Sequence, residues 1–314
     1  MISRPLSRFT VKLLALCVFA AGVCEFNARR ASNAAAPHGA AAKVFQEDGA
    51  FDSLERALRS PEKVRRLALQ SEDQELKHLP AGLGTLVNLE ALEIACLEKL
   101  EDLPEEIGRL RRLRELVIDN GNGCSMNVSL PRSIGQLENL RVLRLYGALD
   151  GRDVGAEDSA RAARAKPLPD TLAGLRNLEE LDLGRNGIRS VPPQVASLSG
   201  LKKLSLDYND IREVPAFVGD LKNLEELSLN ANGGARLPQS LAGLKGLKIF
   251  MGNNRLTLVE QKSLRARFPS AVFNFENEYD DDSANQEPPK PRARRGRRKW
   301  AGDKNNKAPG AADV

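Results

Sequence analysis

The sequence has few of the residues that carry most enzyme chemistry. Only two of its 314 residues are histidines, and aromatic residues make up 4% of the chain. His38 lies in an Ala-rich stretch and His78 stands beside a Leu-Pro step, so neither has a second metal ligand at a usable spacing. No glycine-rich loop ending in Lys-Ser or Lys-Thr is present to cradle a phosphate. We therefore expect no catalytic site, no metal or other cofactor, and no small-molecule substrate.

Cysteine is also scarce, with four residues in the chain. Cys17 and Cys24 lie near the N-terminus, whereas Cys96 and Cys124 fall in two successive long loops. In an oxidising compartment Cys96 and Cys124 could form a disulfide that holds these loops together. Two isolated, reduced cysteines are the alternative, because the loop lengths leave the separation of the two thiols open.

A long hydrophobic run is missing as well. The apolar stretch from Leu13 to Val23 is shorter than the roughly 20 residues of a membrane-spanning helix. Three basic residues precede it and small residues lie at its end, so residues 1–24 are predicted to be a cleaved signal peptide. The protein is then extracytoplasmic, that is periplasmic, secreted or envelope-associated. Lipidation at Cys24, or a basic leader on a cytoplasmic protein, are the alternatives.

The net charge of +5 is concentrated at the two ends of the chain. Residues 1–24 hold three basic residues and no acidic one, and residues 276–314 hold nine basic and eight acidic ones. These ends contribute +3 and +1, which leaves about +1 for the body, so global charge selects no partner for it. The basic run Arg292–Lys299 could make a weak contact with an anionic polymer or a membrane surface. The alternative is a solvated tail whose acidic and basic patches neutralise one another.

What the sequence does contain is a repeat. Successive units of 23 residues open at Leu178, Leu201, Leu224 and Leu247. The first three units carry leucine-type residues at the same positions, followed by an asparagine and by Val-Pro or Leu-Pro, and the unit from Leu247 is a degraded copy. A period of this length is typical of a solenoid, in which each unit stacks on its neighbours.

The repeat reads L-x-x-L-x-L-x-x-N-x-I-x-x-L-P-x-x-I-x-x-L and resembles the typical-length class of leucine-rich repeats. This class occurs in plant Ras-group repeat proteins, animal Ras-pathway scaffolds and many bacterial proteins. The resemblance covers roughly residues 64–275. It implies an α/β leucine-rich repeat solenoid, with a curved parallel β-sheet on the concave side and short helices or turns on the convex side. It also implies a helical N-terminal cap and a C-terminal cap made of a helix and a strand.

The residues themselves explain this shape. Apolar and polar residues alternate in Leu181-Asp182-Leu183, which predicts a short strand with its leucines facing inward. Asparagines recur at the bend after the strand, where their amides can bond the backbone of a neighbouring coil. They are Asn186, Asn209, Asn232 and Asn254.

The predicted organisation has six parts. They are the signal peptide (1–24), a disordered Ala-rich linker (25–49), the cap helix (50–63), about eight repeats (64–255) with an insertion at 147–166, the C-terminal cap (256–278) and a disordered charged tail (279–314).

The first repeats are longer than the later ones, with spacings of 25, 24, 27 and 38 residues between strands against 23 afterwards. The extra residues all lie between the strand and the Leu-Pro step, so we expect them to emerge along one edge of the solenoid. Insertions often collect at a binding face; mere tolerance of insertions there is the alternative. The candidate partner-binding residues of these edge loops are Asn120, Asn122, Arg152 and Asp153.

The concave face supplies the second group of candidates, because tyrosine and arginine are favoured interface anchors. The outward strand positions and the bends after them hold Arg144, Tyr146, Asp182, Arg185, Asp207, Tyr208 and Asn230. Beside them runs a ladder of alternating charge, Glu179-Glu180, Lys202-Lys203, Glu225-Glu226 and Lys248, which we interpret as structural ion pairing between strands.

These features predict an exported, non-catalytic module that binds a protein partner through the concave face and the irregular edge loops. One alternative is an envelope-associated structural protein anchored by its basic C-terminal tail. Another is a cytoplasmic Ras-type scaffold, if the leader is not cleaved.

Overall fold

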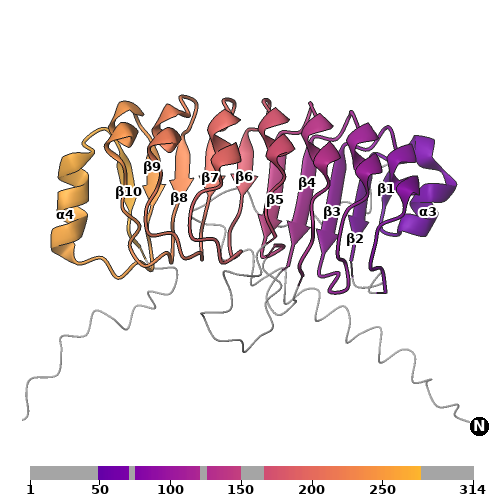
Figure 1. Ribbon diagram of the computed structural model, residues 1–314, viewed down its shortest axis with the longest axis horizontal. Coiled ribbons are helices and arrows are strands. Elements are labelled where there is room, and N and C mark those ends of the chain that lie inside the picture. Colours follow the sequence, from indigo (N-terminus) through magenta and orange to yellow (C-terminus); the bar gives the residue numbers. More distant parts are fainter. Residues whose placement is uncertain (1–48, 71–74, 121–125, 150–165, 277–314) are drawn as a thin grey trace, which may run out of the picture. The chain divides into compact units, whose positions relative to one another are not determined.

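The computed structural model describes residues 49–70, 75–120, 126–149 and 166–276. These residues form a solenoid whose ten strands make one parallel sheet in sequence order (Figure 1). The predicted leucine-rich repeat solenoid is confirmed. Its strands are β1 (Ala50–Phe51), β2 (Arg66–Leu69), β3 (Ala91–Ala95), β4 (Glu115–Asp119), β5 (Val142–Tyr146), β6 (Glu180–Asp182), β7 (Lys203–Ser205), β8 (Glu226–Ser228), β9 (Lys248–Phe250) and β10 (Val272–Asn274).

Each coil returns through a short 3-10 helix, and these helices lie in a row along one border of the sheet (Figure 1). Each of the seven follows a proline, because the ring fixes φ at a value that suits the start of a helical turn. Their bounds are Ala81–Thr85, Glu105–Arg109, Arg132–Gln136, Asp170–Gly174, Pro193–Ser197, Ala216–Asp220 and Gln239–Gly243.

The core is a stack of leucine layers. Leu181 pairs in register with Leu204, and Leu204 with Leu227, and each of the three is at most 1% exposed. Since a single coil cannot enclose its own leucines, burial is achieved only by stacking.

Buried asparagines join successive coils, as the repeat pattern predicts. The Asn209 amide donates to the carbonyl oxygen of Leu183 at 3.0 Å and accepts from the backbone N–H of Asn186 at 3.0 Å. Asn232 and Asn254 repeat this arrangement one and two coils further on. In the longer coils the same place is filled by the buried apolar residues Leu97 and Ala148.

Both ends of the stack are closed by a helix and a strand. At the N-terminal end α3 (Leu54–Arg59) is followed by a 3-10 turn (Pro61–Lys63), and the strand β1 before it pairs with β2. The sequence predicted only a helix here and missed this strand. At the C-terminal end α4 (Leu258–Arg267) precedes β10, which pairs with β9.

The predicted signal peptide, most of the linker and the charged tail lie outside the described residues, as do residues 150–165 of the predicted insertion. In the part of the chain that the structure describes, we find no helix with the length and apolarity needed to cross a membrane.

Candidate functional site

The outer face of the sheet, opposite the leucine core, carries three columns of side chains that run across the strands. The first column is Arg66, Ala91, Glu115, Val142, Glu180, Lys203, Glu226 and Lys248. The middle column is Ala68, Glu93, Val117, Arg144, Asp182, Ser205, Ser228 and Phe250. The last column is Ala95, Asp119 and Tyr146, and continues two residues beyond the shorter strands as Gly184, Asp207, Asn230 and Gly252.

The first column is largely neutralised by its own ion pairs. Glu226 lies between Lys203 at 3.3 Å and Lys248 at 3.2 Å. In the row just before it, Glu179 pairs with both Arg141 and Lys202. The alternating ladder expected from the sequence is therefore occupied by cross-strand pairs, and exposed pairs of this kind contribute little to stability.

Arg144 and Tyr146, both predicted for partner binding, lie on β5 near the middle of the outer face. The Nε of Arg144 donates to Glu180 at 2.7 Å, and both side chains are less than one fifth exposed. Tyr146 is half-buried, and its ring lies over Gly184, where an added Cβ would come within 2.8 Å of Tyr146 Cδ2. Glycine at that position makes room for the tyrosine.

Asp182 and Asp207 are half-buried carboxylates held by neutral donors. Asp182 accepts the N–H of Gly184 at 2.8 Å. Asp207 accepts the hydroxyl of Ser228 at 2.6 Å and the N–H of Asn230 at 2.7 Å. Burial raises the pKa of Asp182 above its ordinary value and that of Asp207 to about 7, because the hydrogen bonds offset only part of the lost hydration.

Three carboxylates of the same face were missed by the sequence analysis, namely Glu93, Glu115 and Asp119. Glu93 is half-buried, and burial, followed by the charges of Asp119 and Glu115, raises its pKa. The signal was available in the sequence, since all three occupy outward positions of strands whose alternation is plain. A hollow of about 40 Å³ lies beside Glu93 and Glu115, and its lining also includes Arg66, Leu67, Ala68, Ala91, Leu92 and Val117.

Arg185, Tyr208 and Asn230 lie at the bends that follow the strands. Arg185 and Tyr208 have left-handed backbone, with φ of 57° and 55°. Their N–H groups donate to the carbonyls of Asp207 and Asn230 in the next coil, both at 2.8 Å. The Asn230 amide donates to Asp207 and accepts from the Gly252 N–H at 2.7 Å, so its polar atoms are used within the sheet.

One of the four edge-loop candidates, Asn120, lies within the described residues. Asn120 is only 6% exposed and donates to the carbonyl of Gly147 at 2.9 Å. The Asn120 amide is therefore buried between two coils, where it offers little surface to a partner, and its role in binding stays a prediction. The other three edge candidates, Asn122, Arg152 and Asp153, lie outside the described residues.

Cys96 is half-buried and held in a disulfide. Its predicted partner Cys124 lies outside the described residues, as does the basic run Arg292–Lys299.

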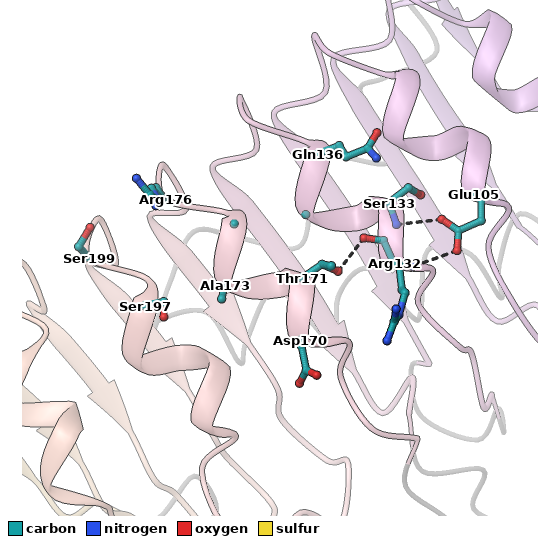
Figure 2. A pocket seen from close by; sticks show the side chains of 12 residues that line it. Glu105, Arg132, Ser133, Gln136, Asp170, Thr171, Ala173, Arg176, Ser197 and Ser199 are labelled. Atoms are coloured by element: carbon teal, nitrogen blue, oxygen red, sulfur yellow. Dashed lines mark hydrogen bonds between the residues drawn. The ribbon is translucent and has the colours of Figure 1, made fainter.

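The turn side of the solenoid carries a larger, open hollow of about 910 Å³ (Figure 2). One wall is fixed by the Glu105 carboxylate, which accepts the N–H groups of Arg132 at 3.1 Å and Ser133 at 2.9 Å. These bonds lower the pKa of Glu105, that from Ser133 most. The lining mixes both signs of charge with hydroxyl groups and small residues, and no sequence pattern predicted this hollow. The remaining lining residues are Gly135, Gln136, Asp170, Thr171, Ala173, Gly174, Arg176, Ser197 and Ser199.

Within the described ranges, no group of three or more His, Cys, Asp or Glu side chains is placed to hold a metal ion. His78, the histidine among these residues, has its Nδ1 3.0 Å from the carboxylate of Asp102 in the next coil.

No family model matches the chain. Two curated proteins share parts of it. TMV resistance protein N of Nicotiana glutinosa is 34% identical over 127 residues, which cover 36% of this chain and 11% of that protein. Uridine 5'-monophosphate transferase of Xanthomonas campestris pv. campestris (strain 8004) is 33% identical over 100 residues, which cover 32% and 18%. The chain therefore spans less than a fifth of the length of each of these relatives.

Solved structures of similar fold include an LRR protein of Leptospira interrogans, with 25% identity, a TM-score of 0.44, and 73% of this chain and 70% of that one covered. Internalin C2 of Listeria monocytogenes has 19% identity, a TM-score of 0.46 and coverage of 69% and 83%. The plant peptide hormone receptor RGFR1, solved in complex with RGF2, has 20% identity, a TM-score of 0.40 and coverage of 72% and 42%. Because each copy of the sequence repeat forms one coil of a single parallel sheet, the chain is a leucine-rich repeat protein.

Proposed function

We propose that this protein is a binding module that captures a protein partner on the outer face of its sheet. The observation that carries the proposal is that the middle column stays partly exposed over five successive strands, from Glu93 on β3 to Ser205 on β7. The leucines of the same strands are buried, so the outer side chains are the part of the strand that the fold leaves free to vary.

The size of the face suits such a partner. Ten strands at about 4.8 Å spacing extend for roughly 43 Å, and five residues of strand measure about 16 Å. The product, roughly 700 Å², is close to the ~800 Å² that each partner buries in a stable complex. Arg144 and Tyr146 lie on β5 near its middle, and residues of these types are frequent binding hot spots.

Substitutions of two valines test where on the protein the partner binds. Val117 lies on the outer face in β4, whereas Val87 is 52% exposed on the turn side. In a capture experiment from extracts of the producing cells, Val117→Arg is expected to lose the partner that the unchanged chain retains. Val87→Arg adds the same charge and bulk elsewhere and is expected to retain it. Equal capture by both variants would place the binding site elsewhere.

We further propose that the protein acts outside the cytoplasm. The disulfide at Cys96 supports this, because structural disulfides persist in oxidising compartments. Mass spectrometry of the native protein under non-reducing conditions is expected to show a chain cleaved near residue 24 with no free thiol at Cys96. An intact N-terminus with a free Cys96 would refute export.

A further inference from the structure

The hollow on the turn side keeps unused hydrogen-bond donors at both of its ends (Figure 2). Arg176, Ser197 and Ser199 lie at one end, and Arg132 lies toward the other. All four side chains are exposed, and within the described residues none of them forms a hydrogen bond or an ion pair. Two guanidinium groups and two hydroxyl groups are therefore available to a ligand that enters the hollow.

The two carboxylates of the lining are already engaged by the protein. Glu105 accepts the backbone N–H groups of Arg132 and Ser133, and Asp170 accepts a hydrogen bond from Nε2 of Gln194 at 3.1 Å. The Ser133 N–H does most to lower the pKa of Glu105, whereas the charge of Arg132 does least among the groups that lower it. The hydrogen-bonding capacity left in the hollow is therefore mainly that of guanidinium and hydroxyl donors, which suits a ligand with acidic groups.

Between its two ends the hollow is lined by small residues. An added Cβ at Gly135 would come within 2.1 Å of the Thr171 carbonyl oxygen, and one at Gly174 within 2.8 Å of the Gly135 carbonyl oxygen. Glycine at both positions therefore lets two neighbouring 3-10 helices lie in contact along the hollow. The described lining contains no aromatic or large aliphatic side chain. The volume of about 910 Å³ is near the upper end of the roughly 300–1,000 Å³ of small-ligand sites, so the hollow has room for more than a single ion.

From this arrangement we propose that the turn-side hollow binds an acidic oligosaccharide, in which sugars that carry a carboxylate alternate with neutral sugars. A guanidinium group holds a carboxylate through two parallel hydrogen bonds, so Arg132 and Arg176 each take one acidic sugar. The hydroxyls of Ser197 and Ser199 both donate and accept hydrogen bonds, as sugar hydroxyls do, and they bind the neutral sugar. This site is separate from the outer face of the sheet, so the proposal goes beyond the capture of a protein partner.

Other classes of acidic ligand fit this lining less well. Single-stranded nucleic acids stack their bases on aromatic side chains, and the described lining has none. A polymer with closely spaced negative charges would bring some of them against the carboxylates of Glu105 and Asp170, where like charges repel. An oligosaccharide with spaced acidic groups places hydroxyls rather than charges beside these carboxylates.

The test uses the full-length protein and a tetrasaccharide of alternating glucuronic acid and N-acetylglucosamine. Isothermal titration calorimetry is expected to show binding of this sugar, and at least tenfold weaker binding of the neutral tetrasaccharide of N-acetylglucosamine. Arg132→Gln combined with Arg176→Gln is expected to weaken binding of the acidic sugar at least tenfold. The matched control is Arg109→Gln combined with Arg112→Gln, which removes two exposed guanidinium groups of the turn side that do not line the hollow. This control is expected to have less than a twofold effect.

A second pair of substitutions separates hydrogen bonding from charge. Ser197→Ala combined with Ser199→Ala keeps every charge and is expected to weaken binding of the acidic sugar at least threefold, whereas attraction between charges alone would leave it unchanged. Thermal melts of all the double variants check that the fold is retained.

Four results would overturn the proposal. They are no measurable binding of the acidic tetrasaccharide, equal binding of the neutral one or of a tetraglutamate peptide, equal weakening by the two arginine pairs, and unchanged binding by the serine pair. Val117→Arg alters the outer face and is expected to bind the acidic sugar as the unchanged chain does. Loss of the sugar in this variant would place the sugar on the outer face and would also refute the turn-side site.

Discussion

Replacing Asn209 with alanine is the most direct test of how the coils are held together. The Asn209 side chain is 6% exposed, and both its oxygen and its nitrogen form hydrogen bonds. Its Oδ1 accepts the N–H groups of Asn186 at 3.0 Å and Ile188 at 3.2 Å. Its Nδ2 donates to the carbonyls of Leu183 at 3.0 Å and Leu206 at 2.9 Å. Asn209→Ala removes all of these bonds and adds no polar atom in their place.

The size of the loss in free energy of unfolding depends on which backbone groups keep another hydrogen-bond partner. The Leu206 carbonyl also accepts from the amide of Asn232 at 2.9 Å, so its loss is partly covered. The N–H groups of Asn186 and Ile188 lie inside the bend and depend on Asn209. Leaving a buried donor unsatisfied costs about 1–3 kcal/mol. Two such donors predict a loss of roughly 2–6 kcal/mol in the free energy of unfolding.

Asn223→Ala is the matched control, since it removes the same side chain from the turn side. The Asn223 amide is exposed and donates to the Ser199 carbonyl at 2.8 Å, where water can replace it. Its loss is expected to cost less than about 1 kcal/mol. Urea unfolding gives both values, and hydrogen exchange should show faster exchange of the Asn186 and Ile188 amides in Asn209→Ala alone. Similar losses for the two variants would refute the claim that buried amides join the coils.

Two further predictions concern single residues of the outer face and its bends. Because burial raises the pKa of Asp207 from 3.8 to about 7, the folded state holds this proton more tightly than the unfolded state, and its contribution to stability falls as pH rises from about 4 through 7. Asp207→Asn should remove this pH dependence. Urea titrations should therefore show the free energy of unfolding of the variant rising, relative to that of the unchanged chain, by roughly 2–3 kcal/mol between pH 5 and pH 8. A difference between the two proteins that does not change with pH would contradict this prediction. Ala231 has a left-handed backbone with φ of 52°, which strains an alanine but not a glycine. Ala231→Gly should therefore stabilise the fold by about 0.5–1 kcal/mol, which is the strain energy relieved minus the extra conformational entropy that a glycine loses on folding. A lower urea midpoint for the variant would refute the claim of backbone strain.

The fold could be predicted from the sequence because the repeat places each leucine among the same neighbours in every coil. The inward leucines and the buried Asn186 could be assigned from one unit and then copied along the chain. The ion pairs of Glu226 with Lys203 and Lys248 followed from the same register.

Features without a periodic counterpart could not be assigned in this way. Ala50–Phe51 forms a strand because β2 offers an open edge, and two residues are too short for any pattern to show it. Asn120 sits in a coil of unusual length, and only the structure shows that its amide turns toward Gly147 rather than toward solvent. The hollow on the turn side depends on where Gly135 and Gly174 fall relative to Arg176, which no spacing in one dimension reveals.

The sheet does not require the half-buried carboxylates of its middle column, and their burial lowers stability. Polar residues such as Ser205 and Ser228 occupy the same middle column without any ionisable group, so the sheet does not need a charge there. Glu93 and Asp182 nevertheless carry carboxyl groups in this column. Burial raises the pKa of both groups, so their ionised forms lower the stability of the fold near neutral pH. Perturbed ionisable groups that do not serve the fold concentrate at functional sites. We therefore expect the binding energy of a partner to come from the middle column of the outer face rather than from the first column.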